Sequence, residues 1–242
     1  MLRDNLALLV PKQTKDDWGC LVTEMPTAHK SASVYDPTSV VPLYLYETDS
    51  ALLKKKGVKA ENFDPDFRNA INAAVGFKPT PEEVFAYLYA VLYSPAYRLR
   101  YAPFLRIGFP RVPLPTAKNF KRFVALGQRL MDLHLMRAVE PSITKFPIPG
   151  KNRIDKFVFK LDSETSETGT IAINSTQHFD RVPVNVWNYT IGGHAVAKKW
   201  LKDRKGRSLT FDELQHYASV ISAIDATMRI EGRIDELMDL PR

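Results

Sequence analysis

The sequence lacks the features that a disulfide-framed, zinc-stabilised or membrane protein needs. Its one cysteine, Cys20, permits neither a disulfide framework nor a cysteine-based zinc site, so we expect a reducing compartment, the cytoplasm. No apolar run approaches the ~18 residues of a membrane span, and the longest extends from Val84 to Tyr93. The amino end also lacks a signal-peptide pattern. We therefore expect no membrane partner.

Common catalytic motifs are missing as well. There is no Asn/Asp-Pro-Pro-aromatic motif, which in adenine methylases surrounds a flipped amino group with carbonyl acceptors, and no glycine-rich cofactor turn. A glycine-rich phosphate loop ending in Lys-Ser/Thr and a Gly-x-Ser-x-Gly elbow are absent too. His178 and Asp180 lie close in sequence, but no third metal ligand follows at a suggestive spacing. We expect no catalytic residues, metal or cofactor in this chain.

The sequence does contain an excess of positive charge on a chain of ordinary globular composition. Hydrophobic residues make up 45% and charged residues 25% of its 242 residues, enough for one large domain or two small ones. The formal net charge is +7, and the pI is about 9.4. This balance favours an anionic partner, nucleic acid first, although many basic domains bind none.

The stretch from Thr80 to Pro115 carries the clearest structural signals. Thr80 and Glu83 have the spacing of a capping box, and the proline after Thr80 fits a first helical turn, so a helix begins here. Ser94-Pro95 ends this helix and starts another, because proline breaks the hydrogen-bond ladder but is tolerated in a first turn. The prolines from Pro103 to Pro115 exclude further regular helix, so IGFPRVPLP should run extended over the helices.

Periodicity predicts the remaining elements and an α+β fold class, a helical scaffold packed with a small, mostly antiparallel β part. The polar segment Ser163–Gly169 is expected to be a hairpin loop. Strands are expected at Asn5–Val10, Cys20–Thr23, Val40–Tyr46, Phe157–Leu161, Ile171–Ile173 and Val184–Trp187. Helices are expected at 64–74, at 118–136, and from Thr210 to about Gly232 with an option to resume to Leu237.

We interpret residues 1–242 as a single module. Its alternative division separates a mainly helical part with amino-terminal strands, 1–140, from a β-rich part with a carboxyl-terminal helix, 141–242. The charge run Lys54-Lys55-Lys56 with Lys59 is expected to be a solvated surface loop, with a phosphate contact as the alternative.

Three blocks of the sequence resemble one protein family. They are NLALLVPKQT with VPLYLY between Asn5 and Tyr46, YAVLYSPAYRLRYAPFLRIGFPRVPLP, and VWNYTIGGHAVAKKWLKDRKGRSLTFDEL from Val186 to Leu214. In this order they resemble the C-terminal specificity region of type ISP restriction-modification enzymes and related helicase-methylase polypeptides. The resemblance implies a target-recognition module for double-stranded DNA that is not an enzyme by itself. It also implies a parent polypeptide with nuclease, helicase-type ATPase and adenine-N6 methyltransferase domains.

The same resemblance assigns cofactors and partners. S-adenosylmethionine and ATP with Mg²⁺ are expected only in the parent enzyme, and none is expected in this chain. The expected partners are double-stranded DNA and the methyltransferase domain of the parent polypeptide.

A basic cluster lies near the carboxyl end of the sequence. Its cations would position a duplex through phosphates without reading the sequence, and the alternative is a solvated helix face. Two glycines upstream, at an expected strand-to-helix turn, would let the backbone approach an anion, or would serve only as a tight turn. The residues predicted to bind phosphate are Lys198, Lys199, Lys202, Arg204, Lys205, Arg207, Gly192 and Gly193.

Two polar loops contain the side chains that read base edges. Arg pairs with guanine, and Asn or Gln pairs with adenine, in the major groove. The alternative is that each loop is an ordinary exposed turn. The predicted base-reading residues are Asn174, Gln177, His178 and Arg181 in one loop, and Lys151, Asn152 and Arg153 in the other. Trp187 and Trp200 are expected in the core, and His134 is expected to be a hydrogen-bonded packing residue.

These features favour a sequence-specific DNA-recognition module, and two alternatives stay open. One is a protein-interaction scaffold that docks onto a methylase, for which the tyrosine-rich helix at Tyr87, Tyr89, Tyr93, Tyr97 and Tyr101 is the best support. The other is a fragment of an enzyme with unrecognised catalytic residues.

Overall fold

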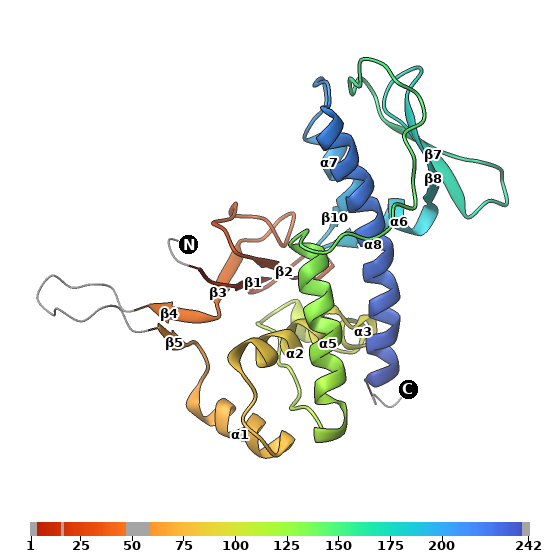
Figure 1. The fold of residues 1–242 in the computed structure, drawn as a ribbon. Coiled ribbons are helices and arrows are strands. Elements are labelled where there is room, and N and C mark those ends of the chain that lie inside the picture. Colours follow the sequence, from red (N-terminus) through yellow and green to blue (C-terminus); the bar gives the residue numbers. More distant parts are fainter. Residues whose placement is uncertain (1–3, 16, 47–58, 239–242) are drawn as a thin grey trace, which may run out of the picture. The chain divides into compact units, whose positions relative to one another are not determined.

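The computed structural model describes residues 4–15, 17–46 and 59–238, and the chain divides into two compact units. Unit 1 comprises residues 1–137 and 230–242, and unit 2 comprises residues 138–229 (Figure 1). Helices and small antiparallel sheets together confirm the α+β class. The division of the chain near residue 140 into separate domains stays a prediction.

Unit 1 opens with short strands. The three strands β1, β2 and β3 form an antiparallel sheet in the order β2-β1-β3, and β4 pairs with β5. Their bounds are β1 (Ala7–Pro11), β2 (Leu21–Thr23), β3 (Thr38–Pro42), β4 (Tyr44–Tyr46) and β5 (Lys59–Glu61). The predicted strands Asn5–Val10 and Cys20–Thr23 are therefore confirmed.

The predicted strand Val40–Tyr46 is wrong in one respect, because it is two strands in two sheets. The break falls at Leu43, which is 2% exposed and donates its backbone N–H to the Leu6 carbonyl. Burying this side chain turns the backbone between β3 and β4. The charge run Lys54-Lys55-Lys56 lies outside the described residues, whereas Lys59 starts β5 with its Nζ 3.6 Å from the centroid of the Tyr44 ring.

The helices of unit 1 begin where local capping predicts. Asp64 accepts from the backbone N–H groups of the first turn of α1, and Ser94 accepts from Tyr97 at the start of α3. At α2 the Thr80 hydroxyl accepts from the Glu83 N–H at 3.2 Å, and the Glu83 carboxylate accepts from the Thr80 N–H at 2.9 Å. The helices are α1 (Pro65–Val75), α2 (Pro81–Tyr93), α3 (Pro95–Arg100), α4 (Ala102–Leu105) and α5 (Ala117–His134).

One prediction about the prolines is wrong. Pro103 does not exclude regular helix, since it lies in the first turn of α4, where its missing N–H costs no hydrogen bond. The segment after α4 does run extended, and we call residues 107–115 the exit segment. Tyrosine side chains bond its backbone, because Tyr97 donates to the Arg111 carbonyl at 3.0 Å and Tyr87 donates to the Pro113 carbonyl at 2.8 Å.

The core of unit 1 is built on α2 and α5. The tyrosines of α2 and α3 face inward, and Tyr89, Tyr93 and Tyr97 are 0–1% exposed. The Tyr89 hydroxyl lies 2.7 Å from His134 Nδ1, so His134 is confirmed as a hydrogen-bonded packing residue. Burial lowers the pKa of His134 to about 4. Tyr87 is buried as well, and Tyr101 is the one partly exposed member of the predicted set, so the five tyrosines do not form an interaction surface by themselves.

Unit 2 contains an antiparallel sheet in the order β6-β7-β8, followed by short helices and a two-stranded hairpin. The hairpin loop predicted at Ser163–Gly169 is confirmed between β6 and β7, except that Thr168 and Gly169 already belong to β7. The elements are β6 (Val158–Leu161), β7 (Thr168–Ala172), β8 (His178–Pro183), α6 (Val184–Asn188), β9 (Thr190–Ile191), β10 (His194–Ala195) and α7 (Val196–Lys202).

The third predicted strand of this sheet was misplaced. Residues Val184–Trp187 form the helix α6, and the strand β8 precedes them. Consecutive burial of Val186 and Trp187, at 0% and 8% exposure, suits a helical turn and not an alternating strand. As a result, His178 and Arg181 lie on a strand instead of the predicted loop.

The last helix, α8 (Phe211–Leu237), contributes to both units. Thr210 and Glu213 form the predicted capping box, with both hydrogen bonds present at 3.0 and 3.1 Å. The predicted break at Gly232 is wrong, because the helix continues through it to Leu237. In unit 1, Asp235 accepts from the Ser94 hydroxyl at 2.5 Å, which joins the end of α8 to the start of α3. None of the described helices is long and apolar enough to cross a membrane.

Candidate nucleic-acid interface

Arg181 projects from an irregularity in the β7–β8 ladder. The register shifts between Gly169 and Ile171 of β7, so that Asp180 and Arg181 of β8 share the space opposite one residue. Arg181 is exposed and has φ 56°, a left-handed conformation that few non-glycine residues adopt. Bulges of this kind redirect a side chain out of the pleat. The bulge therefore presents a guanidinium group to solvent from a strand that is hydrogen-bonded to its neighbours.

The bulge is held from its other edge by residues 144–145. Asp180 exchanges two hydrogen bonds with Lys145, one from the Asp180 N–H to the Lys145 carbonyl and one from the Lys145 N–H to the Asp180 carboxylate, both at 3.0 Å. The Thr144 hydroxyl donates to the Asp180 carbonyl at 2.5 Å. With Asp180 occupied in this way, Arg181 is the exposed member of the bulge.

Gln177, predicted to read a base, is buried instead. Its side chain is 2% exposed, and its amide is saturated within the chain. Oε1 accepts from the Asn152 N–H at 2.8 Å and from Asn174 Nδ2 at 3.1 Å. Nε2 donates to the Ile148 carbonyl at 2.9 Å and to Asn152 Oδ1 at 2.8 Å. We call these residues and their hydrogen bonds the Gln177 network.

Asn174 and Asn152 also use their amides internally. Asn174 Oδ1 accepts from the Gln177 N–H at 2.8 Å and from the Thr176 N–H at 3.0 Å, and Nδ2 also donates to the Arg153 carbonyl at 3.0 Å. Asn152 adopts φ 54° and directs Nδ2 to the Leu209 carbonyl at 3.4 Å. These amides hold two loops together in this conformation and are not free to bind a base.

The loop at 151–153 pairs with the segment 206–209. The Leu209 N–H donates to the Asn152 carbonyl at 2.9 Å, and the Ile154 N–H donates to the Arg207 carbonyl at 2.9 Å. Lys151 and Arg153 are exposed, and Arg153 Nε lies 3.1 Å from the Asp155 carboxylate. The structure thus brings one predicted base-reading loop beside one end of the predicted phosphate-binding cluster.

The six cations of the basic cluster fall into two groups. Four have partners: Lys198 with Asn188 at 3.2 Å, Lys199 with Asp203 at 2.7 Å, Arg204 with the Trp200 carbonyl at 3.2 Å, and Arg207 with Glu213 at 2.9 Å.

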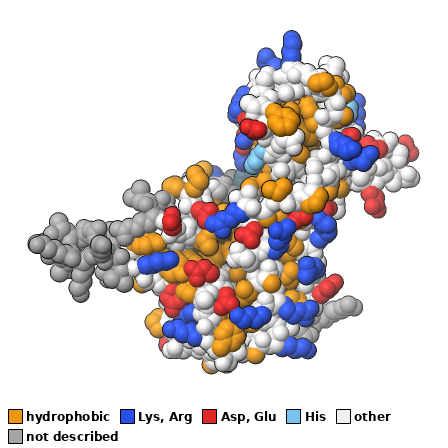
Figure 2. Space-filling view, viewed as in Figure 1, with side chains coloured by type: hydrophobic (Ala, Val, Ile, Leu, Met, Phe, Trp, Pro, Cys, Tyr) orange, Lys and Arg blue, Asp and Glu red, His pale blue; other side chains and the backbone are white. Residues whose placement is uncertain are grey.

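Lys202 and Lys205 are exposed and make no ion pair with any residue of the described ranges. Figure 2 shows several Lys and Arg side chains on unit 2 and others spread over the rest of the visible face. The two lysines are therefore the cations most available to an external anion.

Glu213 is surrounded by this cluster. It accepts the Thr210 N–H of its own capping box, and Arg207 and Arg204 lie beside it. The capping hydrogen bond first, and then the two guanidinium groups, lower the pKa of Glu213. Its negative charge holds Arg207 at the start of α8.

The prediction that Gly192 and Gly193 lie at a strand-to-helix turn is wrong. They form the tight turn of the β9–β10 hairpin, with φ 55° and 79°, values that glycine adopts without strain. The helix α7 begins only at Val196 and has seven residues. The glycines therefore do not place an anion at a helix N-terminus.

The aromatic residues of unit 2 pack as predicted. Trp187 is 8% exposed and stacks on Phe159 with ring centroids 5.4 Å apart. Trp200 packs against the core of unit 2, 4.8 Å from the Tyr217 ring, with the Arg204 guanidinium 3.8 Å from its own ring centroid. Among residues 4–15, 17–46 and 59–238, no three His, Cys, Asp or Glu side chains group as a metal site, and this includes His178 and Asp180.

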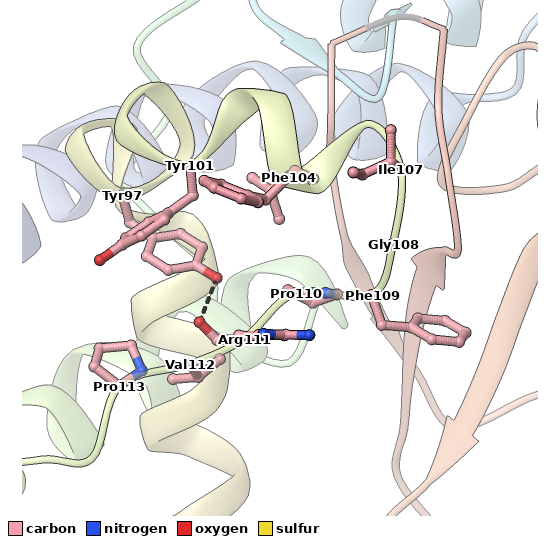
Figure 3. A pocket seen from close by; sticks show the side chains of 11 residues that line it. Tyr97, Tyr101, Phe104, Ile107, Gly108, Phe109, Pro110, Arg111, Val112 and Pro113 are labelled. Atoms are coloured by element: carbon pink, nitrogen blue, oxygen red, sulfur yellow. Dashed lines mark hydrogen bonds between the residues drawn. The ribbon is translucent and has the colours of Figure 1, made fainter.

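An apolar surface on unit 1 was not predicted from the sequence. A groove of about 830 Å³ lies between the helices α3 and α4 and the exit segment, lined by Tyr97, Tyr101, Phe104 and residues 107–113 among others (Figure 3). Of the residues that line it, Phe104 and Ile107 are 67% and 77% exposed. We call the groove with these two residues the apolar surface. Its only sequence signal is a set of large apolar residues between prolines, where no core periodicity requires them.

Comparison with known proteins identifies one family and several structures with the same fold. The family model described as Type ISP C-terminal specificity domain matches residues 1–235. Three solved structures share the fold. The DrdV–DNA complex aligns with a TM-score of 0.76 at 20% sequence identity, over 99% of this chain and 25% of that chain.

The two others are structures of type ISP restriction-modification enzymes. LlaBIII bound to DNA aligns with a TM-score of 0.73 at 20% identity, over 99% of this chain and 16% of that chain. A nuclease-deletion mutant of LlaGI, in complex with a DNA substrate mimic, aligns with a TM-score of 0.64 at 23% identity, over 100% and 21%. This chain spans between 16% and 25% of the length of the three. No curated protein matches it.

Proposed function

Because this chain belongs to the family of type ISP C-terminal specificity domains, we propose that it recognises a specific sequence of double-stranded DNA on behalf of a type ISP-like restriction-modification enzyme. The observation that carries the proposal is the pairing of residues 151–153 with 206–209, which places exposed Lys151 and Arg153 next to the basic cluster. The three fold neighbours named above were solved with DNA or a DNA mimic. The chain itself carries out no chemistry in this proposal.

The two kinds of DNA contact are divided between different residues. Lys202 and Lys205 bind phosphates, fix the module on the duplex and make its affinity depend on salt. Arg181, Lys151, Arg153 and His178 reach base edges, and a guanidinium such as that of Arg181 can pair with both acceptors of a guanine. The bulge fixes the backbone from which Arg181 projects, so no backbone freedom need be lost there on binding.

The catalytic functions belong to the parent polypeptide. We assign to it the adenine-N6 methyltransferase, the helicase-type ATPase and the nuclease, together with S-adenosylmethionine and ATP with Mg²⁺. By holding the duplex, this module would position the target adenine for extrusion into the methylase pocket. Such an enzyme would act in the cytoplasm, where its DNA is accessible.

We assign the apolar surface of unit 1 to docking of the methyltransferase domain. Exposed apolar side chains beside a groove are typical of a binding surface. In a pull-down with a type ISP methyltransferase domain supplied separately, Ile107→Asp should weaken binding at least tenfold, because it places a charge in the interface. Val139→Asp, at a residue that is 79% exposed outside the apolar surface, is the control. Equal binding of both variants and the wild type would refute this assignment.

The DNA proposal is tested by selection from a pool of random duplexes at about 50 and about 200 mM salt. Enrichment of one asymmetric site, with affinity that falls steeply as salt rises, is the expected result. Binding without enrichment would leave only the phosphate contacts of this chain. The absence of binding at both salt concentrations would overturn the proposal and favour the scaffold alternative.

A further inference from the structure

The Gln177 amide has no capacity left for a base. A side-chain amide has two donor hydrogens and two acceptor lone pairs, and all four are used within the chain. The side chain is also 2% exposed. A contact with a base edge would require the residue to leave a buried site and to break these bonds. A glutamine amide can pair with adenine, but this one is buried and acts as an internal brace, a side chain that holds a loop in place.

The Gln177 network holds the loop that carries the exposed cations. Gln177 bonds Ile148 and Asn152, which lie on either side of Lys151. It also bonds Asn174, which in turn donates to the Arg153 carbonyl at 3.0 Å. The backbone that carries Lys151 and Arg153 is therefore anchored before, between and at these residues.

Gly150 packs directly against the Gln177 amide, which is independent evidence that this side chain is fixed. A Cβ atom at position 150 would lie 2.8 Å from Gln177 Cδ, 2.9 Å from Nε2 and 3.0 Å from Oε1. Because the Gln177 amide is tied by four hydrogen bonds, it cannot move aside at low cost. A methyl group at Gly150 would thus displace the network although it has no polar group of its own.

We propose that Gln177 is a positioning residue that sets which bases the module prefers, acting through Lys151 and Arg153 without touching the DNA. This inference rests on the proposed function. It differs from direct reading by Gln177 in one measurable way. A base reader affects the base that it contacts, whereas a brace affects the bases read by the loop that it holds.

The experiment compares base-preference profiles of the full chain, obtained by selection from random duplexes. The variants are Gln177→Met, which removes the amide at similar volume, Gln177→Glu, which keeps the acceptors and loses both donors, and Gly150→Ala. Lys151→Ala and Arg153→Ala identify the bases read by the loop. Gly232→Ala, where a Cβ would meet nothing within 4 Å, is the matched glycine control.

We expect the Gln177 variants and Gly150→Ala to lose roughly tenfold discrimination at the same base positions as Lys151→Ala or Arg153→Ala. Their binding to random duplex and its dependence on salt should stay at the wild-type level, because the phosphate contacts are unchanged. The control should keep the wild-type profile. If Gln177→Met does not fold, the profiles of Gln177→Glu and Gly150→Ala test the inference in its place.

Two results would overturn the inference alone. Loss of preference at a base that neither Lys151→Ala nor Arg153→Ala affects, with Gly150→Ala unchanged, would make Gln177 a direct reader. Wild-type profiles for all Gln177 and Gly150 variants would exclude the brace. A wild-type chain that shows no base preference would instead overturn the proposed function, and the inference with it.

Discussion

Gly127 allows the two main helices of unit 1 to approach each other, and its substitution provides a sharp test of the structure. A Cβ atom at Gly127 in α5 would lie 1.9 Å from the Ala86 carbonyl oxygen of α2, 2.7 Å from the carbonyl carbon of Ala86 and 3.2 Å from Ala90 Cβ. Ala86 and Ala90 are 1% and 0% exposed. Since the obstructing atom is helix backbone, the clash can be relieved only if the helices separate.

The magnitude follows from two opposing effects. Gly127→Ala gains up to about 1 kcal/mol of intrinsic helix stability. Overpacking of a core costs about 1–3 kcal/mol, and the backbone contact places this case at the upper end. We expect a net loss of about 2 kcal/mol in the free energy of unfolding of unit 1. Gly232→Ala, in α8 within the same unit, makes no contact within 4 Å and should stabilise by up to about 1 kcal/mol.

Urea unfolding followed by far-UV circular dichroism measures both variants. The midpoint should fall for Gly127→Ala and rise for Gly232→Ala, at unchanged slope. In a thermal scan, Gly127→Ala should lower the Tm by about 4–8 °C. If Gly127→Ala unfolds at the same urea concentration as Gly232→Ala or at a higher one, the close approach of α2 and α5 is wrong.

Three further predictions concern the cap of α2, the buried histidine and the exposed lysines of the basic cluster. Thr80→Ala removes a capping acceptor and should cost about 1 kcal/mol in urea unfolding, whereas Thr116→Ala, at a cap without a side-chain bond, should cost almost nothing. Burial lowers the pKa of His134 from 6.5 to about 4, so the unfolded chain binds a proton that the folded chain excludes between these values. Stability should therefore fall by roughly 3 kcal/mol as the pH drops through that window, and His134→Gln should remove this part of a pH titration of urea midpoints. Replacing Lys202 and Lys205 by alanine should reduce the slope of log affinity for duplex DNA against log salt by about 0.9 for each phosphate that is no longer neutralised, and an unchanged slope would exclude them as phosphate ligands.

Local sequence determined where four of the described helices begin, α1, α2, α3 and α8. Asp64, Thr80, Ser94 and Thr210 each bond a backbone N–H two or three residues away, so the cap and its helix are encoded together. Such signals survive in any tertiary context, because both partners lie in one turn. The family resemblance likewise depended on the order of residues along the chain, and the family model confirms it.

The recognition region could be predicted less well from residue type and spacing. Asn174, Gln177 and Asn152 have the composition of a base-reading surface, and only their partners show that they bond one another. The pairing of Asn152 with Leu209 joins residues far apart in sequence, which no periodicity predicts. Alternation at Val184–Trp187 suggested a strand, but packing of Val186 and Trp187 into the core of unit 2 made it a helix.

By itself, then, the sequence determined the class of fold, the caps and the excess of positive charge, since each depends on residue type and short spacing. Tertiary structure alone decided which polar side chains stay exposed. The side-chain amides of Gln177 and Asn174 are hydrogen-bonded within the chain, and Gln177 is also buried. Arg181, at the bulge, stays exposed to solvent. The physical reason is that a buried donor or acceptor forms its hydrogen bonds within the fold, and only a group without such a partner can bind DNA. The residues that supply those partners are distant in sequence.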